Sequence, residues 1–186
     1  MELFVTSDLH FQHNNIIKYC NRPFADKEEM NEYLIQEINS KVKEGDEVIH
    51  AGDFMYGTDK AKHFFDVFER LNGNWRFVLG NHDRRTLEKW KDVLLRDHPR
   101  IHEIEFLKRM VHKNKLIIIS HYEMKTWEHK EWRRKSNFRY AGVYHLFGHY
   151  HNNSAAVFDK DTLDIGIDAS DYKLLTMDQQ LDRIKK

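Results

Sequence analysis

The sequence is poor in the residues that mark secreted and membrane proteins. Its 186 residues include one cysteine, Cys20, and two prolines. A single cysteine cannot form an internal disulfide, so no disulfide framework points to an oxidising compartment. No run approaches the roughly 18 apolar residues of a membrane span, and residues 1–6 lack the basic start of a signal peptide. We therefore expect a soluble, cytoplasmic protein with no membrane partner.

The sequence also lacks an excess of either charge. Lysine plus arginine number 30 and aspartate plus glutamate number 30, which gives a net charge of zero with neutral histidines. The overall balance gives no argument for nucleic acid or an anionic membrane as a partner, so any basic surface must be local. The length suits one domain of ordinary size, and we expect residues 1–186 to form it.

Apolar residues are present in short runs that alternate with amphipathic segments. Five runs are too short for helices and predict buried strands: Leu3–Thr6, Val48–Ala51, Trp75–Leu79, Leu116–Ile119 and Tyr144–Phe147. Apolar residues at helical spacing predict three helices: Asp26–Val42, Ala61–Leu71 and Arg85–Arg96. This alternation predicts an α/β fold with a buried sheet.

The second half of the chain departs from this alternation. Two hairpins are predicted there, the first joining Ile101–Val111 to Leu116–Ser120 through Lys113-Asn114 and the second joining Ser154–Phe158 to Thr162–Ile167. Near the C-terminus, Thr176 is suited to cap a last helix, Met177–Ile184.

Thirteen histidines are the unusual feature, and several follow the predicted strands. The motifs after the five runs are Asp8-Leu9-His10, Gly52-Asp53, Gly80-Asn81-His82-Asp83, Ser120-His121 and Gly148-His149-Tyr150-His151. Each motif alone is more often a turn or a core histidine than a ligand. Loops at the carboxyl ends of strands meet in one crevice, so the five together predict a metal site. The two imidazoles of the last motif, at i and i+2, would project to one side of an extended segment.

The residue types in these motifs indicate the kind of metal. Two aspartates, one asparagine and four histidines without a thiolate suit first-row ions such as Mn²⁺, Fe, Zn²⁺ or Ni²⁺. Seven side chains are too many for one tetrahedral ion. They suit two ions that share a bridging carboxylate, roughly 3.5–4 Å apart, an arrangement that activates water and clamps a phosphoryl group.

In this order and spacing the motifs resemble those of the calcineurin-like metallophosphoesterases. The resemblance runs from Asp8 to His151. Three flanking words also look like the short bacterial and phage branch: SDLHFQHNNIIKYCNRPF at 7–24, SHYEMKTW at 120–127 and DIGIDASDY at 164–172. The resemblance implies two facing β-sheets flanked by helices, a four-layer α/β/β/α sandwich.

The resemblance also implies a role for each motif residue. A first metal would be bound by Asp8, His10, Asp53 and His151, and a second by Asp53, Asn81, His121 and His149. His82 would lie near the phosphate as a catalytic residue that is not a ligand, and Asp83 would support it. Attack by a metal-bridging hydroxide would then hydrolyse a phosphoester, with Mn²⁺ as the expected metal.

Residues that would contact the substrate are less well marked. A phosphate-facing role is plausible for His13 and Arg22, and Arg84 could reach the anion, although an ordinary loop or solvent exposure accounts for them equally well. The segment Lys125–Arg139 holds six lysines or arginines with Trp127 and other aromatic residues. We expect it to overhang the site, where it would suit a nucleotide or single-stranded nucleic acid. A solvated amphipathic helix or a dimer contact is the alternative.

Three functions remain open from the sequence. A phosphodiesterase acting on a nucleotide or nucleic-acid phosphate is the first. A phosphomonoesterase acting on a small metabolite or phosphoprotein is the second, because the metal residues suit both. A non-catalytic scaffold on the same fold, like the retromer subunit that resembles these enzymes, is the third. A homo-oligomer is also possible.

Overall fold

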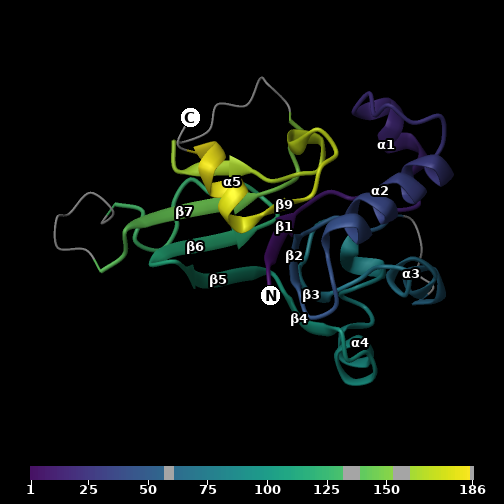
Figure 1. Cartoon of the computed structure of the whole chain (residues 1–186), viewed down its shortest axis with the longest axis horizontal. Helices are drawn as coiled ribbons and strands as arrows, with labels where there is room; N and C mark the ends of the chain where they lie inside the picture. Colours follow the sequence, from purple (N-terminus) through teal and green to yellow (C-terminus); the bar gives the residue numbers. More distant parts are fainter. Residues whose placement is uncertain (57–60, 132–138, 153–159, 185–186) are drawn as a thin grey trace.

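Two β-sheets form the centre of the molecule in the computed structural model, which describes residues 1–56, 61–131, 139–152 and 160–184 (Figure 1). The strands are β1 (Leu3–Thr6), β2 (Glu47–Ala51), β3 (Asn74–Val78), β4 (Ile101–Glu105), β5 (Leu107–His112), β6 (Lys115–Ser120), β7 (Gly142–Phe147), β8 (Thr162–Asp164) and β9 (Leu175–Thr176). The helices are α1 (Asn14–Tyr19), α2 (Lys27–Lys41), α3 (Ala61–Phe68), α4 (Lys91–Asp97) and α5 (Met177–Ile184), with 3-10 turns at Asp83–Arg85 and Asp168–Ser170.

The order of the strands brings the carboxyl ends of the central ones to a common edge. The first sheet has the order β4-β3-β2-β1-β9, with β1 to β4 parallel and β9 antiparallel to β1. The second has the order β5-β6-β7-β8, with β5 antiparallel to β6 and the other pairs parallel. The expected two-sheet α/β architecture is confirmed.

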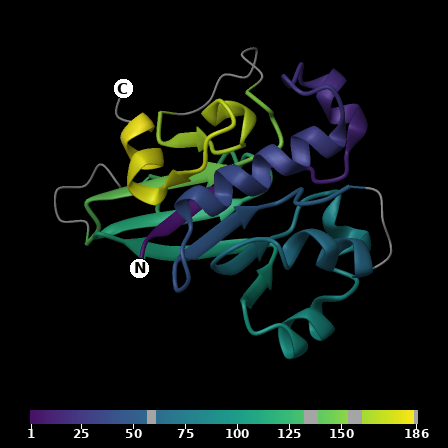
Figure 2. The same cartoon turned by 45° about the vertical axis from the view of Figure 1, so that its right-hand side comes forward.

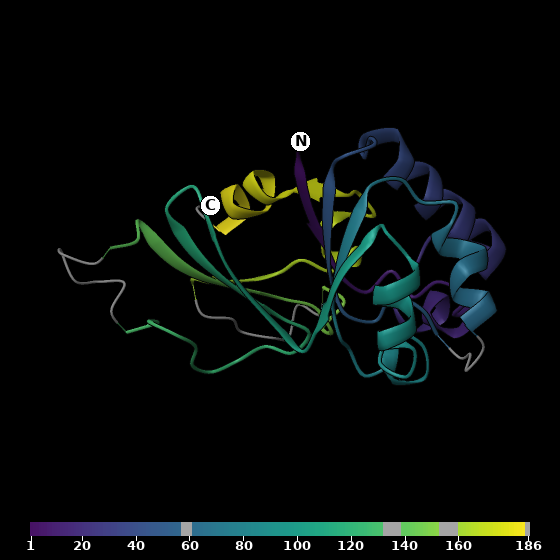
Figure 3. The same ribbon diagram turned by 90° about the horizontal axis from the view of Figure 1, so that it is seen from below.

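Hydrophobic side chains fill the spaces between these layers. Met30, Leu34 and Ile38 of α2 are buried and belong to the cluster that covers the outer face of the first sheet. Figure 2 shows α2 lying across this sheet, and Figure 3 shows the second sheet on its other side. A second cluster, which includes Val5 and Ile119, lies between the sheets and is closed by α5.

Most of the predicted strands and helices are confirmed, and two of the helices begin at capping residues. The five apolar runs are β1, β2, β3, β6 and β7. Asp26 caps α2 by accepting a hydrogen bond from the Glu29 backbone N–H at 2.8 Å. Thr176 caps α5 in the same way, since its Oγ1 accepts from the Gln179 N–H at 3.2 Å.

Two predictions about elements need correction. The helix predicted over Arg85–Arg96 begins only at Lys91, because the chain first makes a 3-10 turn over Asp83–Arg85. The predicted strand Ile101–Val111 is two strands that belong to different sheets, β4 and β5, separated at the exposed Phe106. The hairpin itself is confirmed for β5 and β6, where Lys113 and Asn114 both have positive φ.

The second predicted hairpin cannot be followed through, because Ser154–Phe158 lies outside the described residues. Its partner segment contains β8, which pairs parallel to β7. Within the described parts of the chain, no helix combines the length and the apolar character needed to cross a membrane.

Candidate metal centre

The candidate site lies where the loops after five strands meet. Backbone hydrogen bonds tie these loops together: Asp8 N–H donates to Gly52 O and His10 N–H to Asp53 O, both at 3.0 Å. The loop after β7 joins them, because His149 N–H donates to Asp8 Oδ2 at 2.9 Å. The first sheet and the second sheet therefore both contribute to the site.

One carboxylate oxygen, Asp53 Oδ2, is the focus of the site. The Nε2 atoms of His121, His10 and His82 lie 3.4, 3.6 and 3.8 Å from it. The other oxygen, Oδ1, accepts the backbone N–H of His82 at 2.9 Å. Asp53 is thus fixed through one oxygen and presents the other to three imidazoles.

Two groups of donor atoms meet at this carboxylate. Asp8, His10 and His151 form one group, and Asp53, His121 and His149 form the other; in each, the donor atoms lie within 4.8 Å of one another. Asn81 joins the second group, with Oδ1 3.2 Å from His121 Nε2. The structure thus brings together all seven side chains that the sequence singled out.

The spacing of these donors fits divalent metal ions. Metal–ligand bonds of 2.0–2.2 Å place two ligands of one ion roughly 3–4 Å apart. His10 Nε2 is 3.9 Å from Asp8 Oδ1, and His151 Nε2 is 3.7 Å from the same oxygen. His10 Nε2 is also buried and has no hydrogen-bond partner among the described residues. A buried imidazole nitrogen that faces carboxylates without a hydrogen bond is the arrangement that a cation between them would satisfy.

Hydrogen bonds on the far side of two imidazoles set their orientation. His121 Nδ1 lies 3.0 Å from the Ala51 carbonyl oxygen, which can only accept, so this nitrogen carries the proton. His151 Nδ1 lies 2.8 Å from Asp168 Oδ2. In both rings Nε2 is therefore left to face the carboxylates. This is the usual way in which proteins orient metal-binding histidines.

Asp168 is the residue that the sequence motifs missed. Its side chain is buried beside the site and accepts hydrogen bonds from Arg22 Nε at 2.9 Å and Nη2 at 2.7 Å. The signal was present in the word DIGIDASDY, which had no assigned role. The structure shows that this segment reaches the site through His151.

Arg22 does not have the phosphate-facing position that we considered for it. Its guanidinium is buried and donates to Asp168, to the carbonyls of Asp8 and Leu9, and to the Met30 sulfur. These contacts use all five N–H donors of an arginine. No donor is left for a phosphate, so Arg22 positions the loop after β1 and the carboxylate of Asp168.

The backbone at the candidate ligands is strained. Asp8, His10, Asp53, His149 and His151 all have positive φ, between 51° and 73°. Such left-handed conformations cost of the order of 1 kcal/mol or more for residues other than glycine, and they cluster at functional sites. The last motif is therefore not the extended segment that its sequence predicts. His149 and His151 reach the site because the chain turns at each of them.

Gly148 allows this turn to approach the end of β1. A Cβ atom on Gly148 would lie 1.9 Å from Ser7 Oγ and 2.3 Å from Asp8 Oδ2. Any larger residue would push the loop after β7 away from Asp8. The close approach of the two sheets at the site thus depends on the absence of a Cβ atom in Gly148.

Asp83 holds the backbone of the site. Its carboxylate accepts the backbone N–H groups of Asp53 and Gly80 at 2.8 Å and of Phe54 at 3.0 Å. Among the described residues, no hydrogen bond joins the Asp83 carboxylate to the His82 ring. Burial, together with the charge of Asp53, raises the pKa of Asp83 to about 7.

Nearby carboxylates raise the pKa of two imidazoles of the site, those of His121 and His151. Burial opposes protonation of His121, but contact with Asp53 and the charge of Asp8 outweigh it and raise its pKa to about 9. Burial likewise opposes protonation of His151, and the hydrogen bond to Asp168 with the charge of Asp8 raises its pKa to about 10. Both rings are therefore poised to exchange a proton for a metal ion.

A cavity of about 340 Å³ opens at these side chains. His13 and His82 line it, as do His10, His149 and His151. His13 is buried, with Nδ1 3.3 Å from His10 Nδ1. Arg84 is exposed and is not among the residues that line the cavity.

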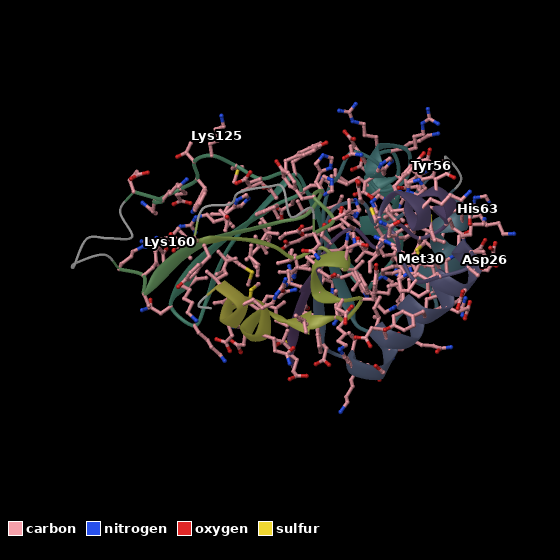
Figure 4. All side chains as sticks on the ribbon, turned by 90° about the horizontal axis from the view of Figure 1, so that it is seen from above. Asp26, Met30, Tyr56, His63, Lys125 and Lys160 are labelled. Carbon is pink, nitrogen blue, oxygen red and sulfur yellow. The ribbon has the colours of Figure 1, made fainter. Side chains whose placement is uncertain are left out.

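The basic and aromatic segment Lys125–Arg139 does not overhang this cavity in its described part. Trp127 is buried and packs with Leu116, Ile118 and Val143 of the second sheet. Figure 4 shows Lys125 well away from Tyr56, which lines the cavity. Residues 132–138, with Trp132, lie outside the described residues. Trp127 is therefore a core residue and has no free ring face for a nucleotide.

Comparison with known proteins agrees with the motifs. The family model described as the calcineurin-like phosphoesterase superfamily domain matches residues 1–163. The chain therefore belongs to this superfamily, and the domain that it carries is of the metal-dependent phosphoesterase class.

Two proteins of unassigned activity are similar to the chain. An uncharacterized protein from Methanocaldococcus jannaschii is 47% identical over 83 residues, which cover 45% of this chain and 47% of that protein. The match thus spans about half the length of this curated relative. The crystal structure of a protein of unknown function from Aquifex aeolicus has a TM-score of 0.70 and 26% identity, and the alignment covers 98% of each chain.

Other solved structures are more distant. A Vps29 single mutant from Entamoeba histolytica has a TM-score of 0.38 and 14% identity, over 82% of this chain and 66% of that chain. A predicted phosphoesterase from Streptococcus pneumoniae has a TM-score of 0.35 and 15% identity, over 88% of this chain and 70% of that chain. Scores this low carry no argument about the site.

Proposed function

We propose that the chain is a phosphodiesterase that uses two divalent metal ions, with Mn²⁺ as the expected metal, to hydrolyse a nucleotide or nucleic-acid phosphodiester. The observation that carries the proposal is the position of Asp53 Oδ2, which faces His10 of one donor group at 3.6 Å and His121 of the other at 3.4 Å. One oxygen facing both groups is what two ions with a shared carboxylate ligand require.

The proposed ligand sets follow the two groups. Asp8, His10, Asp53 and His151 would hold one ion. Asp53, Asn81, His121 and His149 would hold the other. When bound, such ions supply an activated water at neutral pH and neutralise the charge of the phosphoryl oxygens.

The side chains that are not ligands would position and protonate the substrate. His82 is partly exposed at the cavity, and its Nε2 lies 3.8 Å from Asp53 Oδ2. From there it can donate a proton to the leaving oxygen, as a general acid does. Asp83 would act through the backbone that it holds, which keeps Asp53 and His82 in place.

The composition of the cavity favours a diester over a monoester. No lysine or arginine is among the described residues that line it. A phosphomonoester carries up to two negative charges near neutral pH, whereas a diester carries one. A site whose positive charge would come from metal ions and imidazoles alone suits the less charged group better.

Hydrolysis of two aryl phosphates tests the proposal. We expect the Mn²⁺-loaded protein to hydrolyse bis(para-nitrophenyl) phosphate with a higher kcat/KM than para-nitrophenyl phosphate. A preference for the monoester would favour a phosphomonoesterase. A metal-loaded protein inert on both would favour a non-catalytic scaffold.

His82 has its own test. We expect His82→Ala to keep both metal ions and to lose roughly 10²–10⁴-fold in kcat, the usual range for acid–base assistance. Loss of one ion would instead make His82 a ligand, since His10, Asp53 and His82 also lie close enough together to hold a metal. The cytoplasmic location and the oligomeric state stay predictions.

A further inference from the structure

The cavity at the metal centre has two unlike walls. One wall consists of the candidate ligands and His82. The other is formed by side chains without charge, and includes Ile16 and Tyr19 of α1 together with Tyr56. None of the hydrolytic roles proposed above uses this second wall, so its chemistry needs a separate explanation.

Tyr56 is exposed but held firmly in place. The residue is 39% exposed, yet its ring stacks on the buried His13 with centroids 3.7 Å apart and planes 8° apart. His82 meets the same ring edge-on at 5.0 Å. The backbone is fixed as well, because Tyr56 N–H donates to Phe11 O at 3.0 Å. A partly exposed aromatic ring whose orientation is fixed in advance is a prepared stacking surface.

Tyr19 also contacts His13. It is the last residue of α1, is 72% exposed, and meets the His13 ring edge-on at 6.4 Å and 82°. The two tyrosines therefore contact the same histidine, and both line the cavity. Packing within the fold does not account for so exposed a ring at this position.

The second wall is connected to the metal centre by direct ring contacts. His13, on which Tyr56 stacks, lies 5.2 Å from the ring of the candidate ligand His10 and 5.7 Å from that of His82. Tyr56 also contacts His82 directly, so a group bound against Tyr56 would lie beside the residue that is proposed to face the phosphate. The wall is uncharged, so it suits a flat neutral group better than a second phosphate or a carboxylate.

We propose that Tyr56 and Tyr19 form a subsite for a nucleobase, so that the substrate is a phosphodiester with a nucleoside on one ester arm. This inference rests on the proposed function and names the residues that would bind the base of its substrate. Stacking of a base on an aromatic side chain contributes roughly 1–3 kcal/mol, which corresponds to about 5–150-fold in affinity.

Two diesters with the same leaving group isolate this subsite. Thymidine 5′-(para-nitrophenyl) phosphate and methyl para-nitrophenyl phosphate release the same chromophore and differ only in the arm that is not expelled. We expect the wild-type protein to have the lower KM for the thymidine ester. In Tyr56→Leu and Tyr19→Leu, KM for that ester should rise roughly 5–150-fold while KM for the methyl ester stays the same.

Matched variants separate stacking from structural damage. Tyr56→Phe keeps the ring and should keep the wild-type KM. Tyr33→Leu removes a tyrosine of similar exposure, 40%, that lies on α2 and does not line this cavity, so it should change neither KM. Equal changes for both esters in Tyr56→Leu, or no preference for the thymidine ester in the wild type, would overturn the subsite.

A binding measurement keeps the subsite distinct from the proposed function. Thymidine 5′-monophosphate is titrated into the Mn²⁺-loaded wild type and Tyr56→Leu by calorimetry. If neither ester is hydrolysed but the nucleotide binds and Tyr56→Leu weakens it, the proposed function fails and the subsite stands. If hydrolysis occurs and nucleotide binding does not depend on Tyr56, the subsite fails and the function stands.

Discussion

Two imidazoles of the site, those of His121 and His151, are held in a protonated form by their neighbours when no cation is present. Asp53 and Asp8 raise the pKa of His121 to about 9, against the effect of burial. Asp168 and Asp8 raise that of His151 to about 10. Both values lie above neutral pH, whereas a metal ligand must be a neutral imidazole.

Metal binding should therefore release protons. At about pH 7.5 both rings carry a proton in the metal-free protein, and each must lose it when an ion binds, so we expect the release of roughly two protons per chain. Below these pKa values, the affinity for metal should fall as the pH falls. Calorimetric Mn²⁺ titrations in two buffers of different ionisation enthalpy measure the number of protons. Release of no protons would contradict the ligand roles of His121 and His151.

Asp168 should control metal affinity without being a ligand. Asp168→Asn keeps the size of the side chain but removes the negative charge that holds the Nδ1 proton of His151. We expect a loss of roughly 10–100-fold in affinity for one ion, as is usual for residues that orient a ligand, and release of one proton fewer. Asp178→Asn is the control, since Asp178 pairs with His112 and Lys113 away from the cavity. Equal effects of the two substitutions on metal affinity would show that Asp168 does not control metal binding through His151.

At the scale of elements, the site exists because two loops approach each other closely. Gly148 at the end of β7 lies against Ser7 and Asp8 at the end of β1. These loops belong to different sheets, so the contact also sets how the sheets meet at the site.

Gly148→Ala should disrupt the site more than the fold. A Cβ atom 1.9 Å from Ser7 Oγ forces the two loops apart, so we expect loss of most of the bound Mn²⁺, measured by elemental analysis after gel filtration. Gly45→Ala is the matched control, because Gly45 has a φ of 86° but no described atom within 4 Å of the position of a Cβ. We expect this substitution to lower the free energy of unfolding by about 1 kcal/mol and to leave the bound Mn²⁺ unchanged. Full metal content in Gly148→Ala would refute the importance of this contact.

The sequence predicted the elements of the site better than their detailed geometry. Short apolar runs and the motifs after them identified the five strands and all seven candidate ligands, because both signals are local. The turns at His149 and His151 were not predictable, since positive φ at a histidine is imposed by distant contacts such as that of Gly148 with Ser7. The split of Ile101–Val111 was missed because strand periodicity does not say which sheet a strand joins.

Side chains whose partners are distant in the sequence were also assigned wrong or incomplete roles. Arg22 looked available for a phosphate, but its partner Asp168 lies 146 residues further along the chain. Trp127 looked like a stacking residue, but it is buried on the second sheet. In both cases burial decided the role, and burial depends on the whole fold. That residues 1–186 form one domain stays a prediction.

At the scale of the whole molecule, the two donor groups join the two sheets. Asp8, His10, Asp53 and Asn81 follow strands of the first sheet, whereas His121, His149 and His151 follow strands of the second. Bound ions would therefore connect the sheets at the edge where the substrate enters. The central feature of the proposed metal centre is that two ions share Asp53.

Electron paramagnetic resonance of the Mn²⁺-loaded protein tests this claim most directly, because ions that share a carboxylate are magnetically coupled. We predict two Mn²⁺ ions per chain with the multiline spectrum of a coupled pair, and loss of the coupling in Asp53→Asn. A single ion per chain, or two ions that give the spectrum of isolated Mn²⁺, would contradict a shared centre at Asp53.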